Sequence, residues 1–365
     1  MNKKLVAALV AGAFVAPLAQ AAESSNVTLY GIAQVAVSHW DNGEQKKHGV
    51  EDTGSRIGFK GEEALGGGMK AFFQIESSAN LDQGGGTFAS REGWVGLKGG
   101  FGGVQLGRGK SLFDLAQESF DIFNSNSTLI NTLQVDGSYY RVSNTIRYTM
   151  PSVAGFSGGV EYGDMEGKGS NAAGKGVKPA FYSASLRYEN GPLFVQGGYE
   201  HLKEVKKGPL TLTSSSNSND LVAIPGFKSD AYILGAGYTL PFGLGLQGAY
   251  RHIEHKDGGE KKKRDTFLIN AQQPFGPVTL KAGYVQAGNL KGCSGGDCAK
   301  GARWYTAAAE YAFSKRTWVY LEHAMADNKD NSGLFNTSAV DNVGSSANPA
   351  GKDNKTTSLG IIHLF

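Results

Sequence analysis

The sequence predicts an all-β protein, a 16-stranded antiparallel β-barrel that crosses a membrane, and three observations carry this prediction. Apolar and polar residues alternate with period two in blocks of about ten, which is the pattern of barrel strands. Short turns alternate along the chain with long polar connections. Glycine accounts for 53 of 365 residues, roughly twice the usual share, without the Gly-X-Y repeat of collagen.

Hydropathy agrees with strands rather than helices as the membrane-crossing elements. The mean hydropathy is −0.28, and after the first twenty residues no apolar run approaches the ~18 residues that a membrane helix needs. A barrel strand turns every second residue toward water, so its apolar side chains are hidden in such averages.

The N-terminus predicts export. A basic Asn2-Lys3-Lys4 is followed by an apolar stretch over 5–18 and by Ala19-Gln20-Ala21, which fits the small-x-small cleavage rule. We therefore predict a signal peptide over 1–21, with cleavage after Ala22 as the alternative, and one barrel domain over 22–365. Loss of Lys3 and Lys4 lowers the formal charge from +3 to about +1, which argues against a nucleic-acid partner.

Each predicted strand has one apolar and one polar face. Ile57 and Phe59, for example, alternate with Arg56, Gly58 and Lys60. The predicted strands are 27–39, 54–62, 69–80, 88–98, 103–108, 139–150, 156–165, 180–189, 193–203, 230–240, 244–256, 264–273, 278–288, 302–313, 317–327 and 356–365. An even number matters because a closed antiparallel barrel leaves no unpaired edge in lipid.

The connections differ in length in a regular way. Short turns at 99–102, 190–192, 241–243 and 314–316 alternate with long polar stretches. The longest stretches are 109–138, 204–229 and 328–355. Turns on one rim and long loops on the other are typical of outer-membrane barrels.

The long connection at 109–138 contains an apolar cluster outside the strand pattern. Asp114, Glu118 and Asp121 follow the spacing i, i+4, i+7, which places them along one face if the segment is helical. An acidic stripe backed by apolar residues predicts a loop that folds inward, packs on the wall and faces a wet channel. The alternative is an acidic loop exposed at the cell surface.

The two cysteines, Cys293 and Cys298, predict a disulfide that closes one loop of an exported protein. Their C-x4-C spacing differs from the C-x-x-C of redox proteins, and the loop between them contains no histidine for a metal site.

Two other motifs fail as sites. The stretch Gly107-Arg-Gly-Lys-Ser111 resembles a phosphate-binding loop, but Val104 stands where that loop needs its first glycine. On a strand, His252 and His255 point to opposite faces and cannot share a metal. We therefore predict no catalytic residues, no cofactor and no metal.

Five segments carry a family resemblance. They are Val27-Thr-Leu-Tyr-Gly31, Ser55-Arg-Ile-Gly-Phe-Lys-Gly-Glu62, Ser90-Arg-Glu-Gly-Trp-Val-Gly-Leu97, Phe101-Gly-Gly-Val-Gln-Leu-Gly-Arg108 and His363-Leu-Phe365. With them the sequence resembles the general diffusion porins of Gram-negative outer membranes, especially the beta-proteobacterial branch. The resemblance implies a homotrimer of 16-stranded barrels through which small hydrophilic solutes and ions diffuse passively. It also implies a third loop that narrows the lumen.

The resemblance implies a ladder of arginines on the barrel wall opposite that loop. The matching positions are Arg56, Arg91 and Arg141, and strand parity adds Lys60 and Glu76 to the polar faces. Arginine stays ionised among like charges, and cations facing carboxylates orient and screen a solute by size and charge. The predicted pore-lining set is Arg56, Lys60, Glu76, Arg91, Arg141, Asp114, Glu118 and Asp121. The alternative for each arginine is a salt bridge at a rim or turn.

The resemblance also implies partners and a cellular location. The terminal Phe365 is predicted to act as an assembly signal for the barrel-assembly machinery, in an outer membrane of lipid and lipopolysaccharide. The sequence lacks the Pro-Glu-Phe-Gly-Gly loop segment of enteric relatives, so their loop partners are not carried over.

Three other functions can be distinguished from a general porin by the sequence features that each requires. A substrate-specific channel requires a track of aromatic rings down the lumen. A surface adhesin requires aromatic-rich loops, whereas 204–229 and 328–355 consist mostly of Ser, Asn, Asp, Lys and Gly. A barrel hydrolase requires a converging Ser-His-acid cluster. Anion or cation preference is left open.

Overall fold

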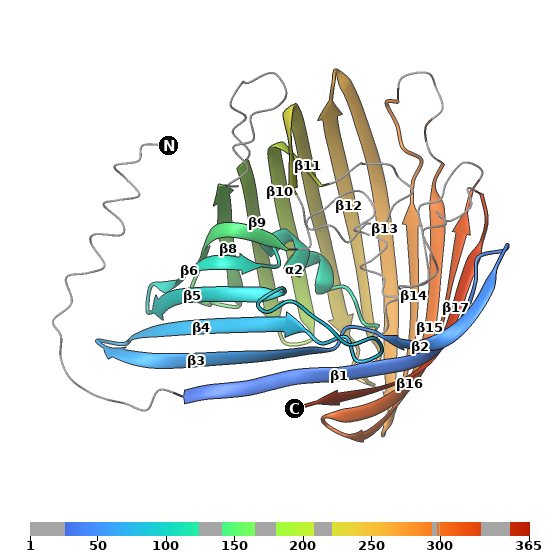
Figure 1. Ribbon diagram of the computed structural model, residues 1–365, viewed down its shortest axis with the longest axis horizontal. Helices are drawn as coiled ribbons and strands as arrows, with labels where there is room; N and C mark the ends of the chain where they lie inside the picture. The colour runs from blue at the N-terminus through green and yellow to red at the C-terminus, as the bar shows by residue number, and fades with distance from the viewer. Residues whose placement is uncertain are drawn as a thin grey trace.

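The computed structural model describes residues 26–123, 141–164, 180–207, 221–293, 298, 300–329 and 351–365. The predicted signal peptide at 1–21 and residues 124–138 of the predicted loop lie outside these residues. The described chain forms one continuous, curved antiparallel sheet (Figure 1).

The strands follow the chain in order around the sheet. They are β1 (Asn26–Asp41), β2 (Lys46–Asp52), β3 (Arg56–Gly66), β4 (Met69–Ser78), β5 (Glu92–Gly99), β6 (Gly102–Gly109), β7 (Val142–Thr149), β8 (Phe156–Asp164), β9 (Ala180–Asn190), β10 (Leu193–Lys207), β11 (Leu221–Thr239), β12 (Gly245–Asp257), β13 (Glu260–Phe275), β14 (Val278–Ala287), β15 (Ala302–Ser314), β16 (Thr317–Asn328) and β17 (Asn354–Leu364). Among the described residues one helix, α2 (Leu112–Glu118), interrupts them between β6 and β7.

The sheet closes on itself because the first strand pairs with the last. Residues 32–41 of β1 pair with 355–364 of β17. The other edge of β1 is shared, since 26–32 pair with β3 and 35–41 pair with β2. β2 and β3 thus occupy one position in the wall, and the seventeen strands make sixteen positions. The prediction of a closed 16-stranded antiparallel barrel is confirmed, and β2 is the segment that was not predicted as strand.

The register gives the wall two opposite faces. On β3, Ile57 and Phe59 point outward and are exposed, whereas Gly58 between them points inward. The same alternation continues around the barrel, so large apolar side chains are exposed and polar side chains such as Ser38, Glu200 and Thr306 are buried. This inversion of a soluble protein's pattern is what a lipid-facing barrel requires.

Outward-facing tyrosines occupy only part of the circumference. The described ones lie on β7 to β15: Tyr148, Tyr162, Tyr182, Tyr188, Tyr199, Tyr232, Tyr238, Tyr250, Tyr284, Tyr305 and Tyr311. The described tyrosines elsewhere, Tyr30 on β1 and Tyr320 on β16, point inward. The barrel therefore has one sector with aromatic belts and one sector, from β16 through β1 to β6, without outward tyrosines among its described residues.

Phe365 lies beside the first strand of the barrel. The backbone of Phe365 exchanges two hydrogen bonds with Gly31 on β1, at 3.0 and 3.2 Å. The Phe365 ring covers Gly31 so closely that a Cβ there would lie 2.3 Å from the ring. Glycine at position 31 is thus required by the close approach of the terminal ring.

No helix in the described part of the chain is long and apolar enough to cross a membrane.

Candidate functional site in the barrel lumen

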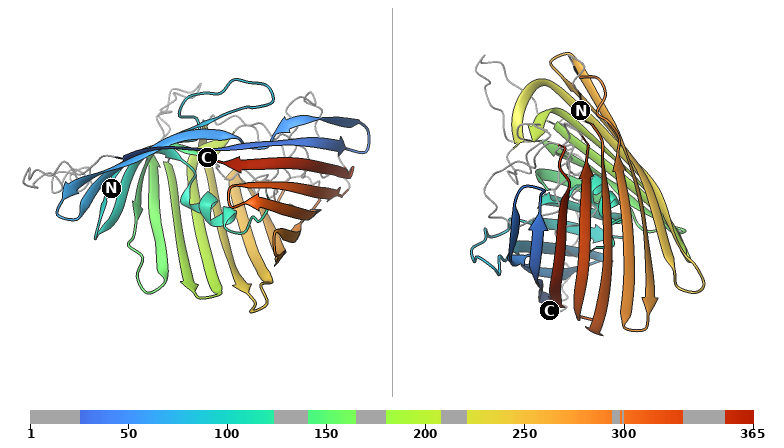
Figure 2. Two further views of the ribbon diagram at one scale, coloured as in Figure 1. Left: turned by 90° about the horizontal axis from the view of Figure 1, so that it is seen from below. Right: turned by 90° about the vertical axis from the view of Figure 1, so that its right-hand side faces the viewer.

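Helix α2 lies inside the curve of the sheet, against the inward faces of β8, β9, β10 and β11 (Figure 2). Ser111 caps its N-terminus, with Oγ accepting a hydrogen bond from the Asp114 amide at 3.0 Å. The same hydroxyl donates to Glu200 on β10 at 3.2 Å. The predicted inward fold of the third loop is confirmed for its described part.

Polar side chains of the wall hold the backbone of this loop. The Leu112 amide donates to Glu161 Oε2 on β8 at 3.1 Å, and the Phe113 amide donates to Ser183 Oγ on β9 at 2.8 Å. Asn270 on β13 donates its side-chain amide to the Phe120 carbonyl. These bonds satisfy loop backbone groups that would otherwise be buried without partners.

Apolar packing fixes the same segment. Phe113, Ala116, Phe120 and Phe123 are buried against inward residues of β11 to β16, which are Ala231, Ile233, Ile253, Leu268, Val285, Ala287, Ala302, Trp304, Ala308, Ala324 and Ala326. Two wall glycines make room for it. A Cβ on Gly198 would lie 2.9 Å from that of Ala116, and a Cβ on Gly235 would lie 2.6 Å from the Phe120 ring.

The predicted acidic stripe does not form as one exposed face. Asp114 has no exposed surface, because it lies in the capped first turn that is pressed onto the wall. Leu115 of the same helix is instead 40 % exposed. The helix ends at Glu118, so Asp121 falls beyond it and accepts a hydrogen bond from the Phe123 amide at 3.0 Å. Glu118 forms a salt bridge with Lys110.

Two of the predicted arginines meet on one carboxylate of the facing wall. Glu76 on β4 lies 2.7 Å from Arg91 Nε through one oxygen, and 3.9 Å from Arg56 Nε through the other. Tyr30 on β1 donates its hydroxyl to Glu76 at 3.1 Å and accepts from Gln74 at 2.8 Å. The structure therefore brings Arg56, Arg91 and Glu76 together, as a cluster with more positive than negative charge.

The third predicted arginine belongs to a second cluster. Arg141 Nε lies 3.9 Å from Glu92 on β5. Glu92 also accepts hydrogen bonds from Trp94 Nε1 at 2.7 Å and from the Lys110 amide at 3.3 Å. This carboxylate thus links the wall to the start of the third loop.

Two arginines next to these clusters were not predicted from the sequence. Arg147 on β7 lies 3.1 Å from Glu161 and 4.7 Å above the Trp94 ring. Arg108 donates to the Ser90 carbonyl at 3.2 Å and to Ser143 Oγ. Strand parity could have placed Arg147, whose register partner on β8 is Glu161. Arg108 lies at an irregularity in β6, between Gly107 and Gly109, where parity fails.

Two further arginines face inward on the loop-bearing side. Arg251 on β12 and Arg264 on β13 are each 1 % exposed. Parity identifies Arg251 as an inward residue, but burial to this degree is not readable from one sequence.

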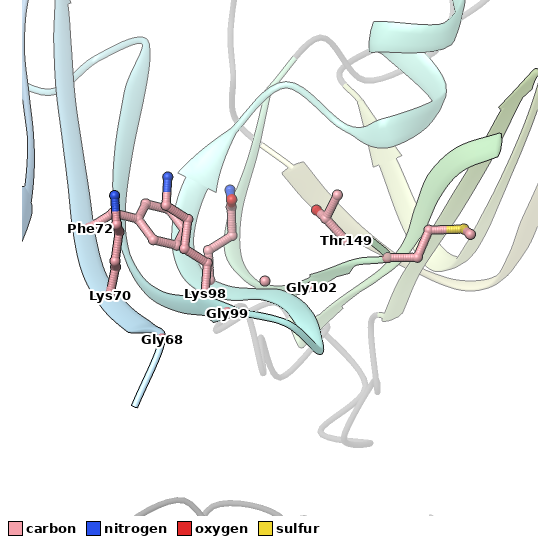
Figure 3. A pocket seen from close by; sticks show the side chains of 10 residues that line it. Gly68, Lys70, Phe72, Lys98, Gly99, Gly102 and Thr149 are labelled. Carbon is pink, nitrogen blue, oxygen red and sulfur yellow. The ribbon is translucent and has the colours of Figure 1, made fainter. Parts of the chain in front are cut away.

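The cationic wall continues to the rim that carries the short turns. Lys60, the fourth predicted cation, lies 5.2 Å from the centre of the Tyr30 ring. Lys70 and Lys98 flank Phe72 in a pocket at this rim (Figure 3), and both form salt bridges with Glu62. Two ammonium groups therefore share one carboxylate at this mouth.

The two cysteines form the bond that the sequence predicts. Cys293 and Cys298 are joined by a disulfide, with Cα atoms 5.5 Å apart. The described residues contain no group of three or more His, Cys, Asp or Glu side chains placed to hold a metal ion.

Comparison with known proteins agrees with this architecture. The family model described as Gram-negative porin matches residues 6–331. The chain is 29 % identical over 348 residues to the major outer membrane protein P.IB of Neisseria meningitidis serogroup B, covering 90 % of this chain and 96 % of that protein. A P.IB protein of Neisseria gonorrhoeae is 30 % identical over 345 residues, covering 87 % of this chain and 91 % of that protein.

Two solved porin structures are also similar to this chain. The anion-selective porin from Comamonas acidovorans superposes with a TM-score of 0.76 at 26 % identity, over 94 % of this chain and all of that one. Salmonella typhi OmpF shares the fold, with a TM-score of 0.64 at 19 % identity, over 93 % of this chain and 97 % of that one.

The fold and the lumen define an outer-membrane channel. The chain belongs to the Gram-negative porin family. It is a general porin of the outer membrane, a water-filled β-barrel for the diffusion of small hydrophilic solutes and ions.

Proposed function

We propose that the filter of this channel lies between α2 and the arginine clusters of β3 to β7. One observation carries the proposal: α2 is held on β8 to β11 within the lumen, while Arg56, Arg91 and Glu76 line the wall formed by β3 to β5. A loop that occupies part of the lumen narrows it, and a charged perimeter at a narrow place sorts solutes by charge. The transport is passive and involves no catalysis or cofactor.

We further propose a preference for anions. The wall of β3 to β6 bears the cations Arg56, Lys60, Lys70, Arg91, Lys98 and Arg108 and the carboxylates Glu62, Glu76 and Glu92. Arg56 and Arg91 share Glu76, and Arg108 donates to two neutral oxygens, the Ser90 carbonyl and Ser143 Oγ. Excess fixed cations enrich diffusing anions in the wet lumen. The selectivity of the Comamonas neighbour agrees with this direction.

The homotrimer is also a proposal, and the tyrosine distribution supports it. Tyrosine belts mark the levels at which a barrel meets lipid headgroups. The described sector from β16 through β1 to β6 has no outward tyrosine, whereas β7 to β15 carry eleven. The tyrosine-free sector is therefore the surface that meets the neighbouring copies.

A recording in planar lipid bilayers tests channel and trimer together. Purified, refolded protein is expected to insert as ohmic units that close in three equal steps. Absence of conductance from folded, heat-modifiable protein would contradict the channel. Closure in a single step would contradict the trimer and leave the channel in place.

A substitution in the tyrosine-free sector separates these two proposals further. Gly61, an outward residue of β3, is a poor position for this substitution, because a Cβ there would lie 2.6 Å from the Phe73 ring. Ala33→Trp on β1 adds bulk to the same outer surface, and Ala184→Trp on β9 is the matched control in the tyrosine-bearing sector. We expect only Ala33→Trp to shift the protein from trimer to monomer in detergent.

The terminal phenylalanine is proposed as the assembly signal. Its ring and backbone join β1 at the point where the barrel closes. Deletion of Phe365 is expected to reduce the amount of folded porin in the outer membrane. An unchanged amount of folded porin would contradict the assembly-signal proposal and would leave the channel proposal unaffected.

A further inference from the structure

Trp94 on β5 lies between the arginine-bearing wall and the root of the third loop. Its side chain is buried on the inward face of the strand. Its Nε1 donates a hydrogen bond to Glu92 Oε2 at 2.7 Å, and the Arg147 guanidinium lies 4.7 Å from the centre of its ring. One aromatic side chain therefore contacts an anion through its edge and a cation through its face.

The root of the loop is fitted to this contact. Gly109 is the last residue of β6, and a Cβ there would lie 1.9 Å from Glu92 Oε2 and 2.0 Å from the Trp94 ring. The next residue, Lys110, donates its backbone amide to Glu92 Oε1 at 3.3 Å. The indole and the loop backbone thus each bind one oxygen of the same carboxylate, and glycine at position 109 lets the chain pass close to both side chains.

Glu92 stands where a carboxylate matters for the charge of the lumen. Its register partner on β4 is Glu76, the carboxylate that Arg56 and Arg91 share. Like charges directly opposite one another on neighbouring strands repel. Arg141 Nε lies 3.9 Å from Glu92, whose side chain is 14 % exposed. A carboxylate held at the wall lies farther from diffusing ions than one that turns into the lumen, and its interaction with them is weaker.

We propose that Trp94 is a positioning residue that sets the charge preference of the channel by holding Glu92 against the root of the third loop. This inference rests on the proposed filter. Without the indole N–H, Glu92 Oε2 loses its donor, which is unfavourable for a largely buried oxygen. The carboxylate then turns toward the water of the lumen, where it offsets the arginine charge.

The test is a double-mutant cycle on the chloride-to-potassium permeability ratio, measured as the reversal potential across a KCl gradient. The variants are Trp94→Phe, Glu92→Gln and the two combined. Phenylalanine keeps a ring face for Arg147 and removes the N–H donor. Heat-dependent migration on gels first shows that each variant is folded. Trp94→Leu, which also lacks the donor, takes the place of Trp94→Phe if that variant does not refold.

The matched control is Trp318→Phe on β16. This indole packs against the inward residues Ala36, Tyr320 and Ile362, and its Nε1 has no hydrogen-bond acceptor among the described residues. The control therefore removes an indole N–H from the same wall without releasing a carboxylate.

We expect Trp94→Phe to lower the permeability ratio by about twofold and Trp318→Phe to leave it at the wild-type value. In the Glu92→Gln background, Trp94→Phe should have no effect, because the residue through which it acts no longer carries a charge. An unchanged or higher ratio in Trp94→Phe would overturn the proposal. A fall that persists in the Glu92→Gln background, or that Trp318→Phe reproduces, would also overturn it, since it would report the loss of an indole alone.

Failure of this inference and failure of the proposed filter give different results. An unchanged ratio in Trp94→Phe, together with a shift toward cations in Arg56→Ser with Arg91→Ser, would remove the role of Trp94 and leave the filter in place. A wild type that prefers cations would contradict the proposed anion preference. The direction of the shift in Trp94→Phe would then still test whether Trp94 restrains the charge of Glu92.

Discussion

Two stretches of one wall, β3 to β7 and β8 to β13, have the same strand pattern but use their inward charges differently. On the first stretch two arginine side chains retain contact with water, Arg56 at 31 % and Arg91 at 13 % exposed. On the second stretch the Glu161 side chain is fully buried and accepts a backbone hydrogen bond from α2. From this comparison we infer that an inward charge is free to act on solutes where the lumen stays wet, whereas it holds the loop where the loop covers it.

Removing the apolar anchors of α2 should have the largest effect. Phe113 and Phe120 are fully buried against the wall, and truncation of a buried Phe to Ala costs about 3–5 kcal/mol of packing. In Phe113→Ala with Phe120→Ala, we expect the loop to leave the wall and the single-channel conductance to change by at least a half. The measurement is the distribution of conductance steps in 1 M KCl.

Leu115→Ala on the same helix is the control, because Leu115 is exposed. If the double variant and this control conduct alike, α2 is not part of the constriction.

Changing the charge of the first stretch should have an intermediate effect. Glu76→Gln keeps the shape of the side chain and removes the carboxylate shared by Arg56 and Arg91. We expect the chloride-to-potassium permeability ratio to rise about two- to fivefold, the factor given by a charge interaction of about 1 kcal/mol or less in water. Glu254→Gln on the outer face should leave the ratio unchanged. A rise in both variants would mean that the ratio does not report the lumen.

Loss of the helix cap should have the smallest effect. Ser111→Ala removes the hydroxyl that accepts from the Asp114 amide, which typically costs about 1 kcal/mol. Amide exchange in α2 is then expected to be about fivefold faster, with little change in mean conductance. Hydrogen exchange followed by mass spectrometry measures this. Ser119→Ala, whose hydroxyl donates to the Ala116 carbonyl at 2.8 Å, is the comparison, and equal acceleration in both would contradict a specific role of the cap.

The barrel itself was predictable because alternation is a local property of the sequence. Every predicted strand has a counterpart, and the difference lies at β2, whose residues Lys46 to Asp52 are mostly charged and show no apolar face. β2 is a strand because it pairs with the far half of β1, a long-range partner that no local pattern reveals. The prediction therefore gave the right number of wall positions while missing one piece of strand.

The geometry of the proposed filter was predictable only in part. The resemblance and parity identified Arg56, Arg91 and Glu76, which do meet. The acidic face of α2 was assigned to water by helical spacing, yet Asp114 is buried while Leu115 is exposed. In a seven-residue helix that lies against a wall, the cap and the backbone bonds to Glu161 and Ser183 decide the orientation, and these partners lie far away in sequence.

The central claim is that the arginines on Glu76 set the charge preference of the channel, and one measurement tests it directly. The reversal potential across a tenfold KCl gradient is compared between the wild type and Arg56→Ser with Arg91→Ser. Arg303→Ser, on the outer face, is the control. We predict an anion-selective potential for the wild type and the control, and a shift toward cations in the double variant. An unchanged reversal potential in the double variant would contradict the claim.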